Sequence, residues 1–166
     1  MKYLIVLLVL LQVSLSYAGQ CDLIKLDEDF VGEQEFNHTI YVPESERSQY
    51  EIKINSKGQI LNSNGSLLDT RNLPNGIAIF VYSKEGKIYL STRRESLVFD
   101  HSSLVGGDDV IVAGAMKVDR GHIDYVTDSS PMYPATKTGN LKAAIYRLKV
   151  MGADTTKLRA FFQSNL

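Results

Sequence analysis

Alternating and continuous apolar positions along the chain predict a series of β-strands. The apolar run at 77–82, IAIFVY, predicts a strong strand, and the turn at 84–87 predicts a hairpin into a partner strand at 88–91. In that turn Gly86 supplies the positive φ that a tight hairpin needs. Further strands are expected at 50–54, 59–61, 110–118 and 122–127. Within the last of these, alternation places one face on Ile123, Tyr125 and Thr127.

Helical periodicity is found near the C-terminus, over residues 138–151. Gly152 follows as a residue suited to end the helix, and the tail at 157–162 favours a last strand over the alternative, a short helix capped by Asp154. The pattern therefore predicts an α+β fold, a mainly antiparallel sheet of roughly five to seven strands with one packed C-terminal amphipathic helix. The apolar stripe of that helix consists of Leu141, Ala144, Ile145, Leu148 and Met151.

The first 18 residues have the organisation of a removable signal peptide. Lys2 precedes an apolar run at 4–15, and the small residues Ser16 and Ala18 suit a cleavage site after Ala18. The run is shorter than the ~20 residues of a membrane span. We therefore expect a secreted protein, extracellular or periplasmic, with no membrane attachment after leader removal. The expected organisation is a signal peptide at 1–18, an acidic arm at 19–49 and a single α+β domain at 50–166.

Charge and cysteine content narrow the classes of partner. Without Lys2 the 18 basic residues become 17, against 19 acidic ones. This balance argues against a nucleic-acid partner, because such proteins need a basic face to displace phosphate counterions. Cys21 is the single cysteine, so no intrachain disulfide forms, and lipidation, an intermolecular disulfide and a free thiol stay open. Asn37 and Asn64 begin glycosylation sequons, which matter only in a eukaryotic source.

Two segments at strand ends carry side chains suited to chemistry or ligand binding. In 100–107 an imidazole stands beside a carboxylate and two hydroxyls, which can transfer protons, and a glycine pair lets a ligand approach the backbone. The second segment is 129–134, SSPMYP. The candidate catalytic residues are His101, Ser102 and Ser103. The candidate ligand-binding residues are His101, Ser102, Ser103, Gly106, Gly107, Ser130 and Tyr133.

A structural interpretation of the same residues competes with the chemical one. Nucleophile, base and orienting group must converge in space, which residues adjacent in sequence rarely do. His101 and the serines would then satisfy buried backbone groups at a tight corner. Other chemistry has less support, because the three histidines lack metal-ligand spacing and no phosphate-binding loop or dinucleotide fingerprint occurs. We therefore expect no metal and no cofactor.

Several short motifs together resemble a known module. They are HSSLVGG at 101–107, AG at 113–114, GHI at 121–123 and SPMYP at 130–134. The combination is similar to a module of the plant IQ-motif calmodulin-binding (IQM) proteins, which also occurs in bacterial secreted, effector-like or polymorphic-toxin-associated proteins. That family reads HHSSFLAG, then AAGE or AAGR, then DG.I, then SGHY.P and a helix. The similarity spans about residues 67–152.

The chain departs from the family pattern at informative positions. Asp100 replaces the first histidine, Ala115 replaces the acidic or basic residue after the AG pair, and Met132 stands where the GHY element has its histidine. If the family uses those histidines in a site, this chain has lost part of it. An IQ motif is absent from the sequence, so the resemblance does not imply calmodulin binding. The resemblance implies fold and compartment more than activity.

Three functions are consistent with the sequence. The first is a secreted, effector-like recognition domain that binds a protein or glycan partner through loops at the end of the sheet. The second is a toxin- or effector-type transferase or hydrolase in which His101 acts as base or orienting group with Ser102 or Ser103. The third is a structural secreted protein. An open cleft at these residues and Tyr133 would favour the first two, and full burial the third.

Overall fold

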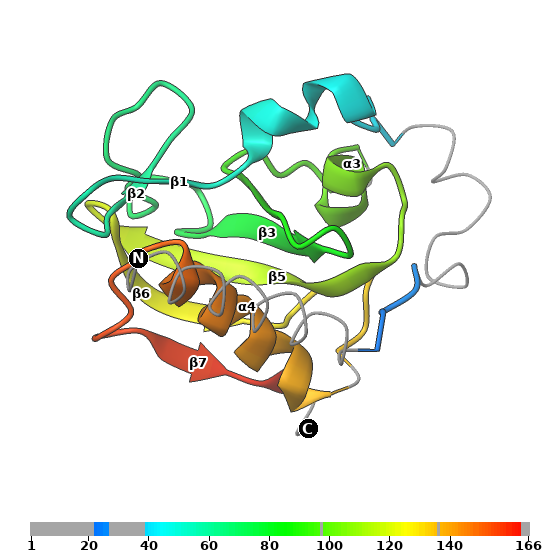
Figure 1. The fold of residues 1–166 in the computed structure, drawn as a ribbon. Coiled ribbons are helices and arrows are strands. Elements are labelled where there is room, and N and C mark those ends of the chain that lie inside the picture. Colours follow the sequence, from blue (N-terminus) through cyan, green and yellow to red (C-terminus); the bar gives the residue numbers. More distant parts are fainter. Residues whose placement is uncertain (1–21, 27–38, 97, 136, 164–166) are drawn as a thin grey trace, which may run out of the picture.

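A computed structural model describes residues 22–26, 39–96, 98–135 and 137–163 (Figure 1). The expected signal peptide, Cys21 and Asn37 lie outside these residues. The described elements, in chain order, are η1 (Glu44–Tyr50), β1 (Lys53–Ile54), β2 (Ile60–Leu61), β3 (Ala78–Ser83), β4 (Ile88–Ser91), α3 (His101–Val105), β5 (Val110–Asp119), β6 (His122–Thr127), α4 (Thr138–Val150) and β7 (Arg159–Phe161). Among the described helices, none is both long enough and apolar enough to cross a membrane.

A five-stranded sheet in the order β4-β3-β5-β6-β7 forms the centre of the molecule. Its neighbouring strands are antiparallel except for the last pair, β6 and β7, which is parallel. The short strands β1 and β2 pair separately. The predicted α+β class with a mainly antiparallel sheet is confirmed, and so are the C-terminal helix and the final strand.

Both faces of the sheet are covered, which explains why β3 is apolar at successive positions. Phe80 points into a core shared with Leu141 and Leu148 of α4. Its neighbours Ile79 and Val81 point into a second core beneath α3. Figure 1 shows α4 lying across the sheet and α3 with η1 at its other side. Burial on both faces is the dominant stabilising contribution for such a strand.

The structure departs from the predicted elements at two places before β5. The alternation at 50–54 leads to a strand of only two residues, since a 3-10 helix occupies Glu44–Tyr50 after Pro43. The Tyr50 ring packs against Phe99, with ring centroids 5.9 Å apart. This contact lies at the end of the 3-10 helix, just before β1 begins. The sequence interpretation also contained no helix at His101–Val105.

The expected common face of Ile123, Tyr125 and Thr127 is wrong. Ile123 and Val126 share the α4-side core, whereas Tyr125 and Thr127 line a hollow elsewhere. The cause is a β-bulge, because the pairing of β5 with β6 shifts between Lys117 and Val118. A bulge adds one residue to a strand and so changes which side chains share a face.

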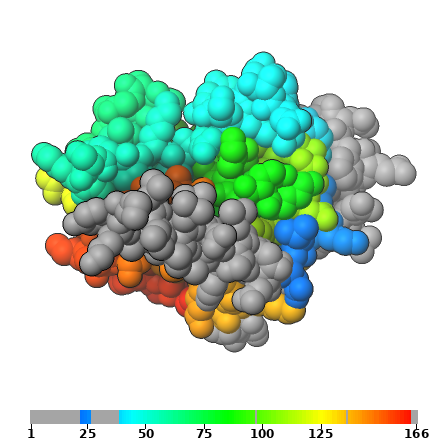
Figure 2. Space-filling model, in the orientation of Figure 1, coloured from blue at the N-terminus to red at the C-terminus, as the bar shows by residue number. Residues whose placement is uncertain are grey.

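The segment 22–26 is seated on the domain. Ile24 is buried and pairs with Val110 of β5 through hydrogen bonds of 2.6 and 3.0 Å. The Asn140 amide of α4 donates to the carbonyl oxygens of Asp22 (2.9 Å) and Ile111 (2.7 Å). Figure 2 shows this segment in blue against the body. These contacts tie the acidic arm to both β5 and α4.

Gly114 of β5 has no side chain, so the chain can pass close to β5 as it leaves the end of β6. A Cβ at this position would overlap the carbonyl oxygen of Thr127 and lie 3.1 Å from the Cα of Asp128. Both are backbone atoms, so a side-chain rotation cannot relieve the overlap. The missing side chain of Gly114 therefore sets the path of residues 128–134 from the end of the sheet.

We expect Gly114→Ala to lower the free energy of unfolding by at least about 2 kcal/mol, because the extra methyl displaces backbone. Gly139→Ala is the matched control. A Cβ at Gly139 meets nothing within 4 Å, and alanine stabilises a helix by up to about 1 kcal/mol over glycine. Urea unfolding of both variants measures the difference. Equal stability of the two variants would contradict the close-approach account.

Candidate functional site

The helix α3 is a single turn fixed by local contacts. The Asp100 Oδ1 atom accepts from the His101 backbone N–H at 2.9 Å, and the Ser103 hydroxyl accepts from the Asp100 N–H at 3.1 Å. The Asp100 side chain also accepts from the Ser103 backbone N–H, and this bond together with the one from the Asp100 N–H to the Ser103 hydroxyl forms a capping box. Gly106, in the left-handed conformation with φ 67°, ends the helix. All five residues of α3 are buried, so its polar groups must find partners inside the protein.

The His101 ring lies between α3 and the central strand β5. It is 1% exposed. Its Nε2 atom is 2.9 Å from the Gly114 carbonyl oxygen, and because a carbonyl only accepts, Nε2 is the donor. Its Nδ1 atom lies 2.7 Å from the Asp100 Oδ1 but is not aligned for a hydrogen bond. The ring thus fixes α3 against the sheet.

The Asp100 carboxylate joins the ring to an arginine. Its Oδ2 atom is 3.6 Å from the Arg94 Nε atom. Burial alone raises the pKa of the Asp100 carboxyl, but the His101 side chain, the Arg94 charge and the His101 N–H outweigh burial, so this pKa lies below its ordinary value. The carboxylate is therefore ionised at neutral pH and holds both neighbours in place.

The polar side chains of the other predicted site residues have hydrogen-bond partners inside the protein. The Ser102 hydroxyl donates to the Met132 sulfur at 3.1 Å, which places the two predicted segments in contact. The Tyr133 hydroxyl donates to the Asp108 carbonyl oxygen at 2.9 Å, and burial raises the pKa of this phenol well above its ordinary value. The two segments therefore lie in contact, but His101, the serines of α3 and Tyr133 are all buried, which favours a structural role for these residues themselves.

The two predicted glycines also have structural environments. Gly106 faces the Arg47 side chain, which a Cβ would strike. A Cβ at Gly107 would lie 3.8 Å from the Tyr41 ring. Both glycines have positive φ and end α3. Arg47 and Tyr41 thus occupy the space that a ligand would need for close approach to this backbone.

A hollow of about 720 Å³ opens beside His101, and we call it the His101 hollow. Two of the predicted residues, His101 and Ser130, line it. Its walls carry two arginines and no acidic side chain. Its lining residues are Ile77, Arg94, His101, Ala115, Tyr125, Thr127, Ser129, Ser130, Pro131, Arg159, Phe161 and Gln163.

Strand geometry explains why the hollow forms at this end of the sheet. The small side chain of Ala115 on β5 leaves depth next to Thr127, its partner on β6. On β7 the residues Arg159 and Phe161 are two apart and so face the same side. The Tyr125 and Phe161 rings meet edge to face, with centroids 5.5 Å apart, and make an aromatic wall.

Sequence reasoning missed most of this lining, and the available signals were weak. Arg94 lies outside every strand and helix that the sequence pattern predicts. Tyr125 and Thr127 were assigned to the face of Ile123, which the β-bulge separates from them. Arg159 and Phe161 alternate along the expected last strand, but no local pattern indicates that this strand pairs in parallel with β6.

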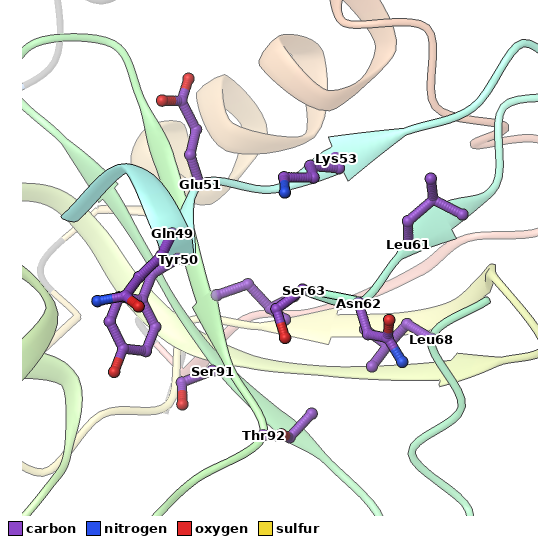
Figure 3. A pocket seen from close by; sticks show the side chains of 11 residues that line it. Gln49, Tyr50, Glu51, Lys53, Leu61, Asn62, Ser63, Leu68, Ser91 and Thr92 are labelled. Carbon is purple, nitrogen blue, oxygen red and sulfur yellow. The ribbon is translucent and has the colours of Figure 1, made fainter. Parts of the chain in front are cut away.

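Two further hollows are less suited to binding. A smaller one of about 200 Å³ lies among η1, β1, the turn at 61–63 and the end of β4 (Figure 3). There the Asn62 amide already bonds Ser66 and its own turn. A third, of about 660 Å³, has paired charges, including Arg71 with Asp119 at 3.3 Å. The described residues contain no group of three His, Cys, Asp or Glu side chains that could hold a metal.

We expect His101→Ala to lower the free energy of unfolding by about 1–3 kcal/mol, because it leaves the buried Asp100 carboxylate and Gly114 carbonyl without the ring. His122→Ala is the control, since His122 is half exposed and surface substitutions change stability by within about 0.5 kcal/mol. Urea unfolding monitored by circular dichroism gives both values. An equal, small effect in the two variants would show that the ring does not stabilise α3.

We expect the cost of Asp100→Asn to depend on pH, while asparagine still caps the helix. Because the folded pKa of Asp100 is lowered, its stabilisation is complete above the ordinary carboxyl pKa of about 4 and disappears as the pH falls through the folded value. The stability gap between wild type and Asp100→Asn should therefore be largest at pH 5–7 and narrow at lower pH. Denaturant unfolding across this range measures it, and a constant gap would contradict the assignment.

Comparison with known proteins places the domain in a family. Residues 46–140 match the family model described as the IQ motif-containing protein middle domain. Neither a curated protein nor a solved structure matches the chain. The matched range contains Arg94, His101 and the 129–131 loop, whereas Arg159, Phe161 and Gln163 lie beyond it. Since the match covers more than half of the 166 residues, this chain belongs to the family of the IQ motif-containing protein middle domain.

Proposed function

We propose that the protein is an exported recognition domain that holds a glycan of its partner in the His101 hollow. The observation that carries this proposal is the hollow itself, about 720 Å³ and lined by hydroxyls, two arginines and an aromatic wall. Concave sites of about 300–1,000 Å³ with a few convergent polar groups are typical of ligand binding. Export and an effector-like role rest on the predicted leader and on the resemblance to secreted bacterial proteins.

Binding is favoured over catalysis by how the predicted catalytic groups are used. The Nε2 atom of His101 donates to the Gly114 carbonyl, and its Nδ1 atom faces a carboxylate. The Ser102 and Ser103 hydroxyls bond Met132 and the Asp100 backbone. A general base needs a free nitrogen within hydrogen-bond reach of its substrate or nucleophile. These bonds leave His101 as a support for the hollow.

A glycan fits the lining better than an apolar peptide segment does. Thr127, Ser129 and Gln163 present hydroxyl and amide groups, which match the hydroxyls of a sugar. Phe161 is 52% exposed beside them and offers an aromatic face to the C–H groups of a sugar ring. A polar ligand with an apolar ring face satisfies both kinds of surface at once.

We expect Ser129→Trp to reduce glycan binding at least tenfold, because an indole in this wall fills the hollow. Ser63→Trp is the matched control, since Ser63 lines the smaller hollow of Figure 3. Binding of the labelled protein to an array of neutral and acidic glycans measures the effect, and thermal unfolding checks that both variants fold. The proposal is overturned if wild type binds no glycan, or if Ser129→Trp binds like wild type.

A further inference from the structure

Resting on the proposed function, we infer that the His101 hollow selects a sugar that bears a carboxylate, a hexuronic or sialic acid, and that Arg94 and Arg159 bind this group. The inference depends on which charges line the hollow, how the arginines are held, and what surrounds them. It names a ligand chemistry and two specificity-determining residues.

The charges that line the hollow are of one sign. Arg94 and Arg159 contribute guanidinium groups, and none of the lining residues is Asp or Glu. The third hollow, of about 660 Å³, provides the contrast, because Asp119, Asp124 and Asp154 stand among its basic residues. We call it the mixed-charge hollow. An anion entering the His101 hollow therefore meets two cations without facing a lining carboxylate. Hydrogen bonds between charged groups are roughly twice as strong as neutral ones.

Each arginine is anchored by an acid and keeps donors for a ligand. The Arg94 Nε atom lies 3.6 Å from the Asp100 Oδ2, and the Arg159 Nη2 atom donates to the Asp124 Oδ1 at 2.6 Å. A guanidinium has five N–H donors in a fixed fork. One contact orients the fork and leaves other donors for a carboxylate, which arginine binds in a bidentate manner.

The remaining lining favours a sugar acid over a small inorganic anion. A phosphate ion would use the cations but leave the hydroxyls of Thr127 and Ser129 and the Phe161 ring without contact. A volume of about 720 Å³ also exceeds the need of a single inorganic anion. A sugar ring with one carboxylate engages the cations, the hydroxyls and the aromatic wall together.

Part of this selectivity lies outside the family domain. Arg159, Phe161 and Gln163 follow the matched residues 46–140, and they enter the hollow because β7 pairs in parallel with β6. The carboxylate preference therefore depends in part on a strand that lies outside the matched residues.

The test is a titration of the full chain with glucuronic acid and with glucose, its neutral counterpart, followed by NMR. Glucuronic acid should bind at least tenfold more tightly, weaken with added salt, and shift the amide signals of Thr127, Ser129 and Ser130. Arg94→Gln and Arg159→Gln should each weaken glucuronic acid at least tenfold and weaken glucose much less, so that the preference for the acid narrows. N-acetylneuraminic acid extends the test to the second acid class.

Control variants distinguish the loss of a charge at the hollow from the loss of a charge elsewhere and from a failure to fold. Arg120→Gln removes an exposed arginine of the mixed-charge hollow and should not change binding. Because Arg94 also contacts Asp100, Arg94→Lys keeps a positive charge there and should weaken binding less than Arg94→Gln. Arg159 is exposed, so Arg159→Gln should fold normally and tests the inference even if Arg94→Gln does not.

The outcomes distinguish the inference from the proposed function. Equal binding of glucose and glucuronic acid, unaffected by the arginine variants, would overturn the carboxylate preference and leave glycan recognition standing. Acetate or inorganic phosphate binding as tightly as glucuronic acid would overturn the choice of a sugar acid. If neither these sugars nor any glycan on the array binds, both the inference and the proposed function fail.

Discussion

The placement of His101 between the Gly114 carbonyl and the Asp100 carboxylate is the contact on which the α3 side of the molecule depends. The ring spans from a one-turn helix to the central strand, 13 residues further along the chain. A helix this short is not stable by itself. It is held by its capping box, by the core residues Leu104 and Val105, and by this ring.

The same contact has a second consequence at the surface. The ring that closes the α3-side core also lines the His101 hollow, and the carboxylate that holds the ring contacts Arg94. The stability of α3 and the orientation of Arg94, which lines the hollow, are therefore coupled through Asp100. Its carboxylate lies between a ring and a guanidinium.

The hollow combines residues inside the family match with residues beyond it. Residues 46–140 contain β1 to β6 and α3, and they provide the floor and one wall of the hollow. The helix α4 covers the opposite face and returns the chain so that β7 adds to the free edge of β6. Arg159 and Phe161, the latter being one side of the aromatic wall, come with that strand. An edge strand beyond the matched residues thus supplies part of the hollow without altering the core.

Local patterns in the sequence determined the strands β3 to β6, the helix α4 and its end at Gly152, because each depends on periodicity and turn chemistry within a few residues. They also singled out His101 and Ser130, two of the residues that line the His101 hollow. Tertiary structure decided the rest. The bulge in β6, opposite the step from Lys117 to Val118, moved Tyr125 and Thr127 away from the face of Ile123, and the parallel pairing of β7 brought Arg159 and Phe161 to the hollow. Ser102, Ser103 and Tyr133 were buried by packing between α3 and the 129–134 segment. Register, strand order and burial depend on residues far apart in the chain, so no local pattern contains them.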